Sequence, residues 1–266
     1  MLKIINASKA FLAGTPNEHV ALKNVSLSLT KGEFVTIIGS NGAGKSTLFN
    51  AIGGTFWLDR GKILLQGDNI TYMAEHRRAS MIGRLFQDPV KGTAPDMTIE
   101  ENLALAYNRK SKNGLRIGVH RKDVQIFREK IAQLNMGLEN RMKTKVGLLS
   151  GGQRQALSLL MATISTPRLL LLDEHTAALD PASAEKIMLI TKNIVSQESI
   201  TTMMITHNIQ SALKTGSRTI MLDRGKIILD ISGQERADMT VPRLMELFSQ
   251  QSKNTLDNDR MLFVNN

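Results

Sequence analysis

Residues 39–46 constrain this chain more than any other segment. They read GSNGAGKS and match the pattern G-x-x-x-x-G-K-[ST] at every position. The β-branched run 33–38 precedes them and an apolar helical pattern follows, so a strand enters the segment and a helix leaves it. Glycines let the backbone curve around phosphates with its N–H groups turned inward, and a helix N-terminus adds a positive dipole end. The segment therefore predicts a phosphate-binding loop, whose residues are Gly39, Ser40, Asn41, Gly42, Ala43, Gly44, Lys45, Ser46 and Thr47.

A second acidic site is expected at the end of the apolar run 169–173, which reads LLLLD and is followed by Glu174. A continuous apolar run predicts a parallel strand that is covered on both faces. In the phosphate-loop pattern Lys45 contacts the β- and γ-phosphates and the Ser46 hydroxyl faces Mg²⁺. Asp173 is then expected to hold Mg²⁺, and Glu174 to polarise the attacking water as general base. Taken alone, the two carboxylates are equally well explained as a solvated strand end.

A third motif is the string LSGGQ, which stands 23 positions before Asp173 and opens an amphipathic helix. A hydroxyl and two glycine amides at a helix N-terminus form a second anion site. Taken alone, the string is also explained as an ordinary serine-capped helix. Its residues are Leu149, Ser150, Gly151, Gly152 and Gln153.

Together these motifs resemble the ATP-binding subunits of ABC transporters, whose signature is LSGGQ. The resemblance covers about residues 2–248 and implies roles for further residues. Gln87 matches the Q-loop glutamine that reaches Mg²⁺ and water, Asp180 the D-loop, and His207 the switch histidine at the γ-phosphate. Phe11 stands where the family places an aromatic residue against adenine. Each has a plainer explanation: a loop glutamine, a helix N-cap, a strand-end histidine and a packed phenylalanine.

One residue departs from the family pattern. Many members have proline after the catalytic glutamate, whereas this chain has His175. We expect a variant loop residue beside the site, although a histidine that titrates near neutrality leaves a catalytic role open. The strings DEHTAALDP, MTIEENLALAY and LLSGGQRQALSLLMAT look most like a bacterial subgroup of amino-acid importers of the tryptophan or tyrosine type. That cargo is implied by resemblance alone.

The fold class that the resemblance implies is α/β. It is a P-loop NTPase ABC cassette with a mostly parallel sheet core, an antiparallel β subdomain and an inserted helical subdomain. Alternating strand and helix patterns agree with a largely parallel sheet. We expect a single cassette over 1–248, with the helical subdomain at about 88–150 and a frayed tail over 249–266. Thr98 and Glu101 predict a capping box, and the spacing of apolar residues predicts a helix over 121–135.

The resemblance also implies partners. Two cassettes pair head to tail, so that each ATP lies between the phosphate loop of one and the LSGGQ of the other. Permease subunits, and a substrate-binding protein in an importer, complete the transporter. The cassette itself is expected at the cytoplasmic face of the inner or plasma membrane, attached through the permease. The chain has no cysteine and no apolar run of about 18 residues, so we expect neither disulfides nor a transmembrane helix.

The remaining feature is charge. Lys and Arg exceed Asp and Glu by 34 to 24, a net charge of +10, which suggests an anionic partner. Residues from about 75 to 147 are polar, basic and helical in period, which predicts a helical insert between two strand-rich segments. They hold 15 basic and 8 acidic groups, which is most of the excess. Anionic lipid would be attracted to such a face, and a solvated basic surface explains it equally well. The alternative to a transport ATPase is a soluble ABC ATPase that acts on nucleic acid or in cytosolic assembly. For the transport ATPase, no direct contact with nucleic acid is expected.

Overall fold

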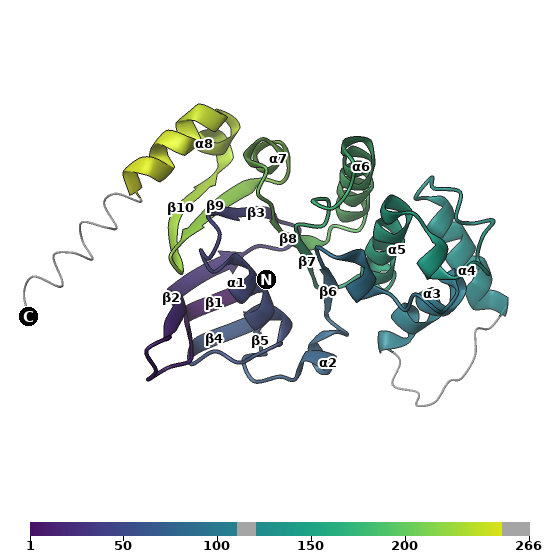
Figure 1. Cartoon of the computed structure of the whole chain (residues 1–266), viewed down its shortest axis with the longest axis horizontal. Helices are drawn as coiled ribbons and strands as arrows, with labels where there is room; N and C mark the ends of the chain where they lie inside the picture. Colours follow the sequence, from purple (N-terminus) through teal and green to yellow (C-terminus); the bar gives the residue numbers. More distant parts are fainter. Residues whose placement is uncertain (111–120, 252–266) are drawn as a thin grey trace, which may run out of the picture. The chain divides into compact units, whose positions relative to one another are not determined.

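The computed structural model of the chain describes residues 1–110 and 121–251 (Figure 1). It divides into two compact units: unit 1 consists of Met1–Met73 and Met203–Asn266, and unit 2 of Ala74–Thr202. The expected tail lies mostly outside the described residues, and its first residues, 249–251, continue a helix that begins at 241.

Unit 1 contains an antiparallel sheet with the strand order β2-β1-β4-β5. Leu2 at the start of the inner strand β1 pairs with Leu29 on one side and with Leu65 on the other. Leu2 and Ile4 are buried while Lys3 is exposed, which is the period of two that a sheet with one covered face requires. The strands are β1 (Leu2–Phe11), β2 (His19–Leu29), β4 (Arg60–Leu65) and β5 (Asp68–Asn69).

The second sheet region of unit 1 is built on a parallel pair. β3 (Phe34–Gly39) runs parallel to β9 (Arg218–Asp223), and β10 (Lys226–Ser232) returns antiparallel to β9. β8 (Thr201–Ile205) borders β3, and the unit boundary passes through it. The helices of this unit are α1 (Lys45–Gly53), α7 (Ile209–Lys214), α8 (Gly233–Ala237) and the helical residues 241–251.

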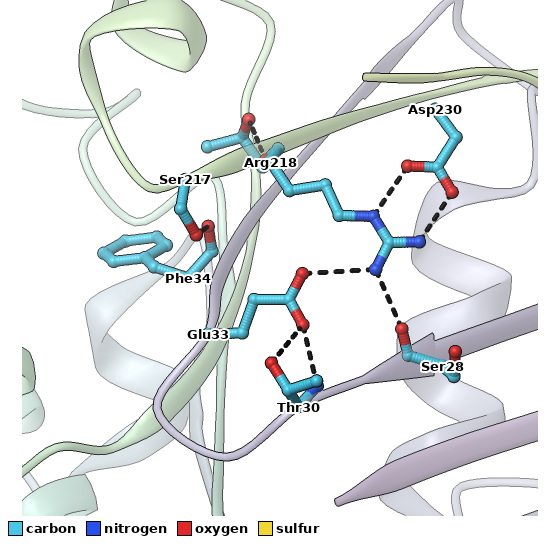
Figure 2. A network of polar contacts seen from close by, with 8 residues as sticks. Ser28, Thr30, Glu33, Phe34, Ser217, Arg218 and Asp230 are labelled. Carbon is cyan, nitrogen blue, oxygen red and sulfur yellow. Dashed lines mark hydrogen bonds and ion pairs between the residues drawn. The ribbon is translucent and has the colours of Figure 1, made fainter. Parts of the chain in front are cut away.

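A polar network fastens this parallel pair to the turn that leads into it (Figure 2). The Arg218 guanidinium donates two hydrogen bonds of 2.6 Å to the carboxylate of Asp230. It also donates to the backbone oxygen of Ser28 and to Glu33, at 2.9 and 3.1 Å. Hydrogen bonding to Asp230 raises the pKa of Arg218, so the guanidinium keeps its charge. One side chain thereby joins β9, β10 and the turn before β3.

Unit 2 combines a short parallel strand pair with helices that pack on one another. β6 (Ile82–Leu85) pairs in parallel register with β7 (Leu169–Asp173), where Ile82 faces Leu169. The side chains of residues 169–172 have no exposed surface, which confirms the buried strand expected from LLLLD. The helices are α2 (Glu75–Arg78), α3 (Ile99–Tyr107), α4 (Arg121–Ala132), α5 (Gly151–Thr163) and α6 (Pro181–Gln197), with short 3-10 turns at Pro89–Gly92, Asn108–Lys110 and Val146–Leu148.

Two local expectations for this unit have clear outcomes. Thr98 caps α3, and Glu101 completes the capping box, as predicted. The stretch from about 75 onward was expected to be helical, but it contains strand β6. Tertiary pairing with β7 overrides the weak local pattern of a four-residue strand that carries an arginine. The mixed sheets and helices agree with the predicted α/β class.

Candidate active site

The predicted site residues fall into two groups, one in each unit. Unit 1 holds the phosphate loop, Phe11 and His207. Unit 2 holds Gln87, Asp173, Glu174, Asp180 and the LSGGQ string. Each group has a geometry of its own, which the local sequence explains.

The phosphate loop requires glycine at two positions for steric reasons. Gly39 ends β3 with φ 149°, and a Cβ there would lie 2.1 Å from the Leu222 backbone oxygen. Gly44 has φ 100°, and its Cβ would lie 2.4 Å from the Ala21 oxygen. Both contacts are with backbone, which cannot move aside cheaply. The loop is therefore closely surrounded by β2 and β9, as a loop that must approach phosphates with its own backbone requires.

Lys45 begins helix α1 and folds back over the loop. Its ammonium donates to the backbone oxygens of Gly39 and Ser40, each at 2.8 Å, and the residue is 6% exposed. The helix has no side-chain cap, because its N-cap residue is Gly44. Ser46 is exposed in the first turn. An uncapped helix N-terminus beside an ammonium and a hydroxyl is suited to binding a polyphosphate.

Two contacts hold the loop against the following strands. Ser40 Oγ donates to Asp223 Oδ1 at 3.2 Å, and the Ala43 oxygen accepts the Gly225 N–H at 3.0 Å.

On the neighbouring strand, the Thr206 N–H donates to the Ile37 oxygen at 3.2 Å, so the end of β8 is fixed beside β3. His207 follows directly and is exposed. Within unit 1 the histidine therefore leaves the same end of the sheet as the phosphate loop does.

Phe11 lies at the end of β1 and packs on another aromatic ring. Its ring meets that of Phe56 edge to face, with centroids 5.3 Å apart. The Lys9 ammonium lies 5.7 Å from the Phe11 centroid and pairs with Asp59 at 2.7 Å. Desolvation raises the pKa of Asp59, but hydrogen bonds from the Ala10 N–H and Lys9 outweigh it and lower the pKa overall. Phe11 is half-buried, so packing explains part of its presence, and adenine stacking stays a prediction.

In unit 2 the parallel register brings the acidic pair and the glutamine to one sheet edge. Leu85 on β6 pairs with Leu172 on β7, so Gln87 and Asp173 follow neighbouring strand ends. Arg84 on β6 stacks on the Phe86 ring, with its guanidinium carbon 4.6 Å from the centroid. Burial lowers the pKa of Arg84, while the charge of Asp173 acts in the opposite direction. A cation therefore stands near the predicted metal carboxylate, which sequence reasoning missed because no motif marks it.

Glu174 has an uncommon backbone. Its φ is 47°, in the left-handed region that non-glycine residues rarely adopt. Its backbone oxygen accepts the Ala177 N–H at 2.9 Å, so a turn begins directly after strand β7. Such conformations persist where the surroundings hold them, and they gather at functional sites.

His175 points away from solvent and is 2% exposed. Its Nε2 lies 3.2 Å from Thr191 Oγ1 on α6. Burial lowers its pKa from 6.5 to about 4, so the imidazole is neutral at physiological pH. Of the two roles that the sequence left open, the loop residue with a structural contact fits this environment. Thr191 was missed as its partner, because a spacing of 16 residues carries no local signal.

The signature string begins helix α5 with a complete capping box. Ser150 Oγ accepts the Gln153 N–H at 3.3 Å, and Gln153 Oε1 accepts the Ser150 N–H at 3.2 Å. Ser150 and Gly151 are exposed, while Leu149 is buried and anchors the string. The hydroxyl and first glycine of the signature are thus presented on the surface of unit 2.

The D-loop aspartate lies beside the signature within the same unit. Asp180 caps α6 by accepting the Ser183 N–H at 3.0 Å, and this side chain's bonds to Ser183 lower its pKa. A Cβ on Gly152 would lie 3.2 Å from Ser183 Oγ, and one on Gly151 would lie 3.5 Å from Leu179. The start of α6 therefore packs closely against the start of α5 at Gly152, whereas a Cβ on Gly151 would make an ordinary contact.

The oxygen groups within each unit have the chemistry that the implied Mg²⁺ prefers. Ser46 of unit 1 provides a hydroxyl, and Gln87 and Asp173 of unit 2 provide an amide oxygen and a carboxylate, all of them hard oxygen ligands. Within the described ranges no cluster of three or more His, Cys, Asp or Glu residues could hold a metal. Mg²⁺ commonly takes one or two protein carboxylates and completes its shell with substrate phosphates and water. A sparse donor set is therefore suitable for an ion that arrives with a nucleotide.

The sequence and the fold are similar to those of known proteins. The family model for ABC transporters matches residues 22–177. A tyrosine transport ATP-binding protein of Clostridioides difficile (strain R20291) is 42% identical over 248 residues, which are 93% of this chain and 98% of the relative. A dimeric ATP-binding cassette in a post-hydrolysis state, bound to ADP and Pi, aligns with a TM-score of 0.75 at 30% identity, covering 87% of this chain and 98% of that one.

A more distant relative is a xylose/arabinose import ATP-binding protein of Sulfolobus acidocaldarius (strain ATCC 33909), 32% identical over 86% of this chain and 89% of its own. Over the part of the chain that the structure describes, no helix is both long and apolar enough to span a bilayer. The motifs, the fold and these relatives lead to one conclusion: the chain belongs to the ABC transporter family, as an ATP-binding subunit that hydrolyses ATP.

Proposed function

We propose that this chain powers the uptake of an aromatic amino acid as one half of a cassette dimer bound to permease subunits. The proposed cargo rests on the 42% identity with a tyrosine transport ATP-binding protein, over nearly the full length of both chains. The subunit is then peripheral, at the cytoplasmic face of the membrane, and a substrate-binding protein delivers the amino acid.

The dimer is supported by the way anion-binding groups divide between the units. One uncapped helix N-terminus, that of α1, offers amides, an ammonium and a hydroxyl, and a second exposed helix N-terminus carries Ser150 and Gly151. In a head-to-tail pair, the signature of one subunit covers the nucleotide held by the phosphate loop of the other. Solved cassettes with 30% identity are dimeric, which agrees with this arrangement.

Each site residue has a separate task in this proposal. The loop amides and Lys45 bind the β- and γ-phosphates, and Phe11 stacks on adenine. Ser46, Gln87 and Asp173 hold Mg²⁺, which neutralises phosphate charge when bound. Glu174 accepts the proton of the attacking water, while His207 donates to the γ-phosphate. Ser150, Gly151 and Gly152 contact that phosphate from the partner subunit, and Asp180 lies beside them.

Hydrolysis and dimer opening are linked by charge. While the γ-phosphate is attached, both subunits bind to it, so the closed dimer is favoured. After cleavage, the contacts from the signature lose their bridging group and the subunits separate. The residues mainly position groups and stabilise charge, as phosphoryl transfer requires.

The substitution Glu174→Gln tests the catalytic assignment. It removes the base but keeps the side-chain volume, so ATP turnover should fall by about 10²–10⁴-fold while ATP binding persists. The measurement is phosphate release at saturating ATP, together with size-exclusion chromatography to detect a trapped dimer. Glu185→Gln, an exposed glutamate on α6, is the matched control and should hydrolyse ATP normally. Wild-type turnover in Glu174→Gln would remove this residue from the base role.

The cargo needs a transport assay. The chain should co-purify with a permease, and vesicles that contain both should take up labelled tyrosine or tryptophan only with ATP. Vesicles assembled with Glu174→Gln supply the matched control, because the complex is intact and only turnover is removed. ATP-dependent uptake of a sugar or an inorganic anion, without uptake of aromatic amino acids, would contradict the proposed cargo.

A further inference from the structure

Glu174 is held in a conformation that its own residue type does not favour. A left-handed backbone is strained for a non-glycine residue, so neighbouring contacts must maintain the φ of 47°. One turn bond follows at Ala177, whose N–H donates to the Glu174 oxygen at 2.9 Å. The next residue, His175, has a side-chain hydrogen bond to Thr191 on α6.

The direction of the hydrogen bond at His175 follows from counting protons. Thr191 is fully buried, and its hydroxyl donates to the Ile187 oxygen at 2.8 Å. A hydroxyl has one proton, so toward His175 its oxygen can only accept. His175 is therefore the donor through Nε2–H at 3.2 Å, which fixes the tautomer of the ring. The chain His175, Thr191, Ile187 runs from the strand end into the body of α6.

We propose that His175 is a positioning residue for Glu174. Its bond to Thr191 fixes the peptide that follows Glu174, and with it the direction of the catalytic carboxylate. This inference rests on the proposed role of Glu174 as general base. His175 does not touch nucleotide and acts only through its neighbour.

The identity of the residue supports a restraint at this position. Proline, which many family members carry here, restricts the backbone through its ring. The imidazole ring of histidine does not include the backbone nitrogen, so it does not restrict the backbone in this way. In this chain a buried hydrogen bond to α6 supplies the restraint instead. Restraint matters because a displacement of about 1 Å in a catalytic group can reduce the rate by about 100-fold. The affinity for ATP should depend little on it, because the phosphate-binding groups lie in unit 1.

The test compares Thr191→Val with Thr191→Ser in the full-length chain. Valine keeps the shape but removes the acceptor, whereas serine retains the hydroxyl. Thr191→Val should lower kcat for ATP hydrolysis about tenfold with KM within about twofold, and Thr191→Ser should keep kcat near wild type. His175→Ala should be at least as slow, and the double variant His175→Ala/Thr191→Val should be no slower than His175→Ala alone.

Thr163→Val is the matched control. Thr163 is buried in the same unit and donates to the Leu159 oxygen at 2.8 Å, just as Thr191 donates to Ile187. Removing its hydroxyl should lower the melting temperature by a similar amount without lowering kcat. The inference is overturned if folded Thr191→Val keeps wild-type kcat, if Thr163→Val slows hydrolysis equally, or if Thr191→Ser is as slow as Thr191→Val.

Glu174→Gln separates this inference from the function on which it rests. Normal turnover in that variant would refute the base role itself. Slow turnover in Glu174→Gln together with normal turnover in Thr191→Val would refute the positioning role alone.

Discussion

The two helix N-termini of the proposed site differ in their capping. Helix α1 follows Gly44, which offers no side chain, so the first turn has no cap from its own sequence. Helix α5 follows Ser150, and a capping box already engages donors at its start. An open N-terminus can bind an anion without first breaking internal bonds, whereas a capped one has fewer donors to give. Nucleotide affinity should therefore lie in unit 1, and the signature should matter mainly for closure and turnover.

The largest effect expected from this contrast is on ATP affinity. Lys45→Ala should weaken binding about 1,000-fold, because charge-assisted bonds to two phosphates, each worth about 1.5–3 kcal/mol, disappear. Ser150→Ala should change affinity less than about threefold, on the same scale. Calorimetric titration of the full-length chain with ATP measures both, and Lys62→Ala, an exposed lysine of unit 1, is the control. Equal losses in Lys45→Ala and Ser150→Ala would break the contrast.

The glycines of the two regions should also differ in what they tolerate. Gly39→Ala places a Cβ 2.1 Å from a backbone oxygen and should destabilise the protein by about 3 kcal/mol or more. Gly152→Ala places its Cβ 3.2 Å from a side-chain hydroxyl and gains helix propensity, so a change under about 1 kcal/mol is expected. Denaturant unfolding of each variant measures the difference. A Gly39→Ala protein as stable as wild type would refute the steric requirement.

Acid should weaken unit 2 through His175. Its pKa is lowered to about 4 in the folded state, so the unfolded chain binds the proton more readily. The stability that this neutral ring contributes is present above about pH 6.5 and is lost as the pH falls toward 4. From pH 7.5 to 5 the loss should be about 2 kcal/mol, measured as the free energy of unfolding.

The variant His175→Gln checks this assignment, since it should flatten the pH dependence in that range. His76→Gln is the matched control, because His76 is an exposed histidine of the same unit. The prediction fails if His175→Gln loses stability with acid as steeply as the wild type.

The smallest effect concerns the cap itself. Ser150→Ala and Thr98→Ala each remove a capping box in unit 2, so each should cost about 1 kcal/mol of stability. Only Ser150→Ala should also slow ATP turnover, because Thr98 belongs to no predicted contact with nucleotide. Melting curves and phosphate release from the same preparations give the comparison. Equal turnover in the two variants would leave Ser150 with a structural role alone.

Local signals predicted what depends on neighbours in sequence. The Thr98 capping box joins residues three apart, and the buried strand at Leu169–Asp173 is evident from its apolar run. The pattern that predicts the phosphate loop lies in its own glycines and in the flanking strand and helix. These parts of the fold and site could be predicted because the sequence signal for each lies in one continuous segment.

What the sequence did not predict depends on distant partners. Strand β6 is only four residues long and is stabilised by pairing with β7, more than 80 residues later. The hydrogen bond between His175 and Thr191 depends on how α6 is oriented against the end of β7. The left-handed backbone of Glu174 could not be predicted either, because glutamate is not a residue type that favours it. Phe11, which the resemblance assigns to adenine, also packs against Phe56, a contact that no sequence pattern predicts.

The division of the chain has a consequence for its synthesis. Unit 2 is one uninterrupted stretch, whereas unit 1 joins the first 73 residues to those after 202. Strand β3 can pair with β9 only after β9 has been synthesised. In the same way, Glu33 can bind Arg218 only after the ribosome has added 185 further residues. The segment that ends in the phosphate loop therefore leaves the ribosome long before its supporting strand exists, while unit 2 is completed first. A nascent chain stalled before residue 218 lacks strand β9, whose Leu222 backbone oxygen lies against Gly39. The ability to bind nucleotide should therefore arise late in translation.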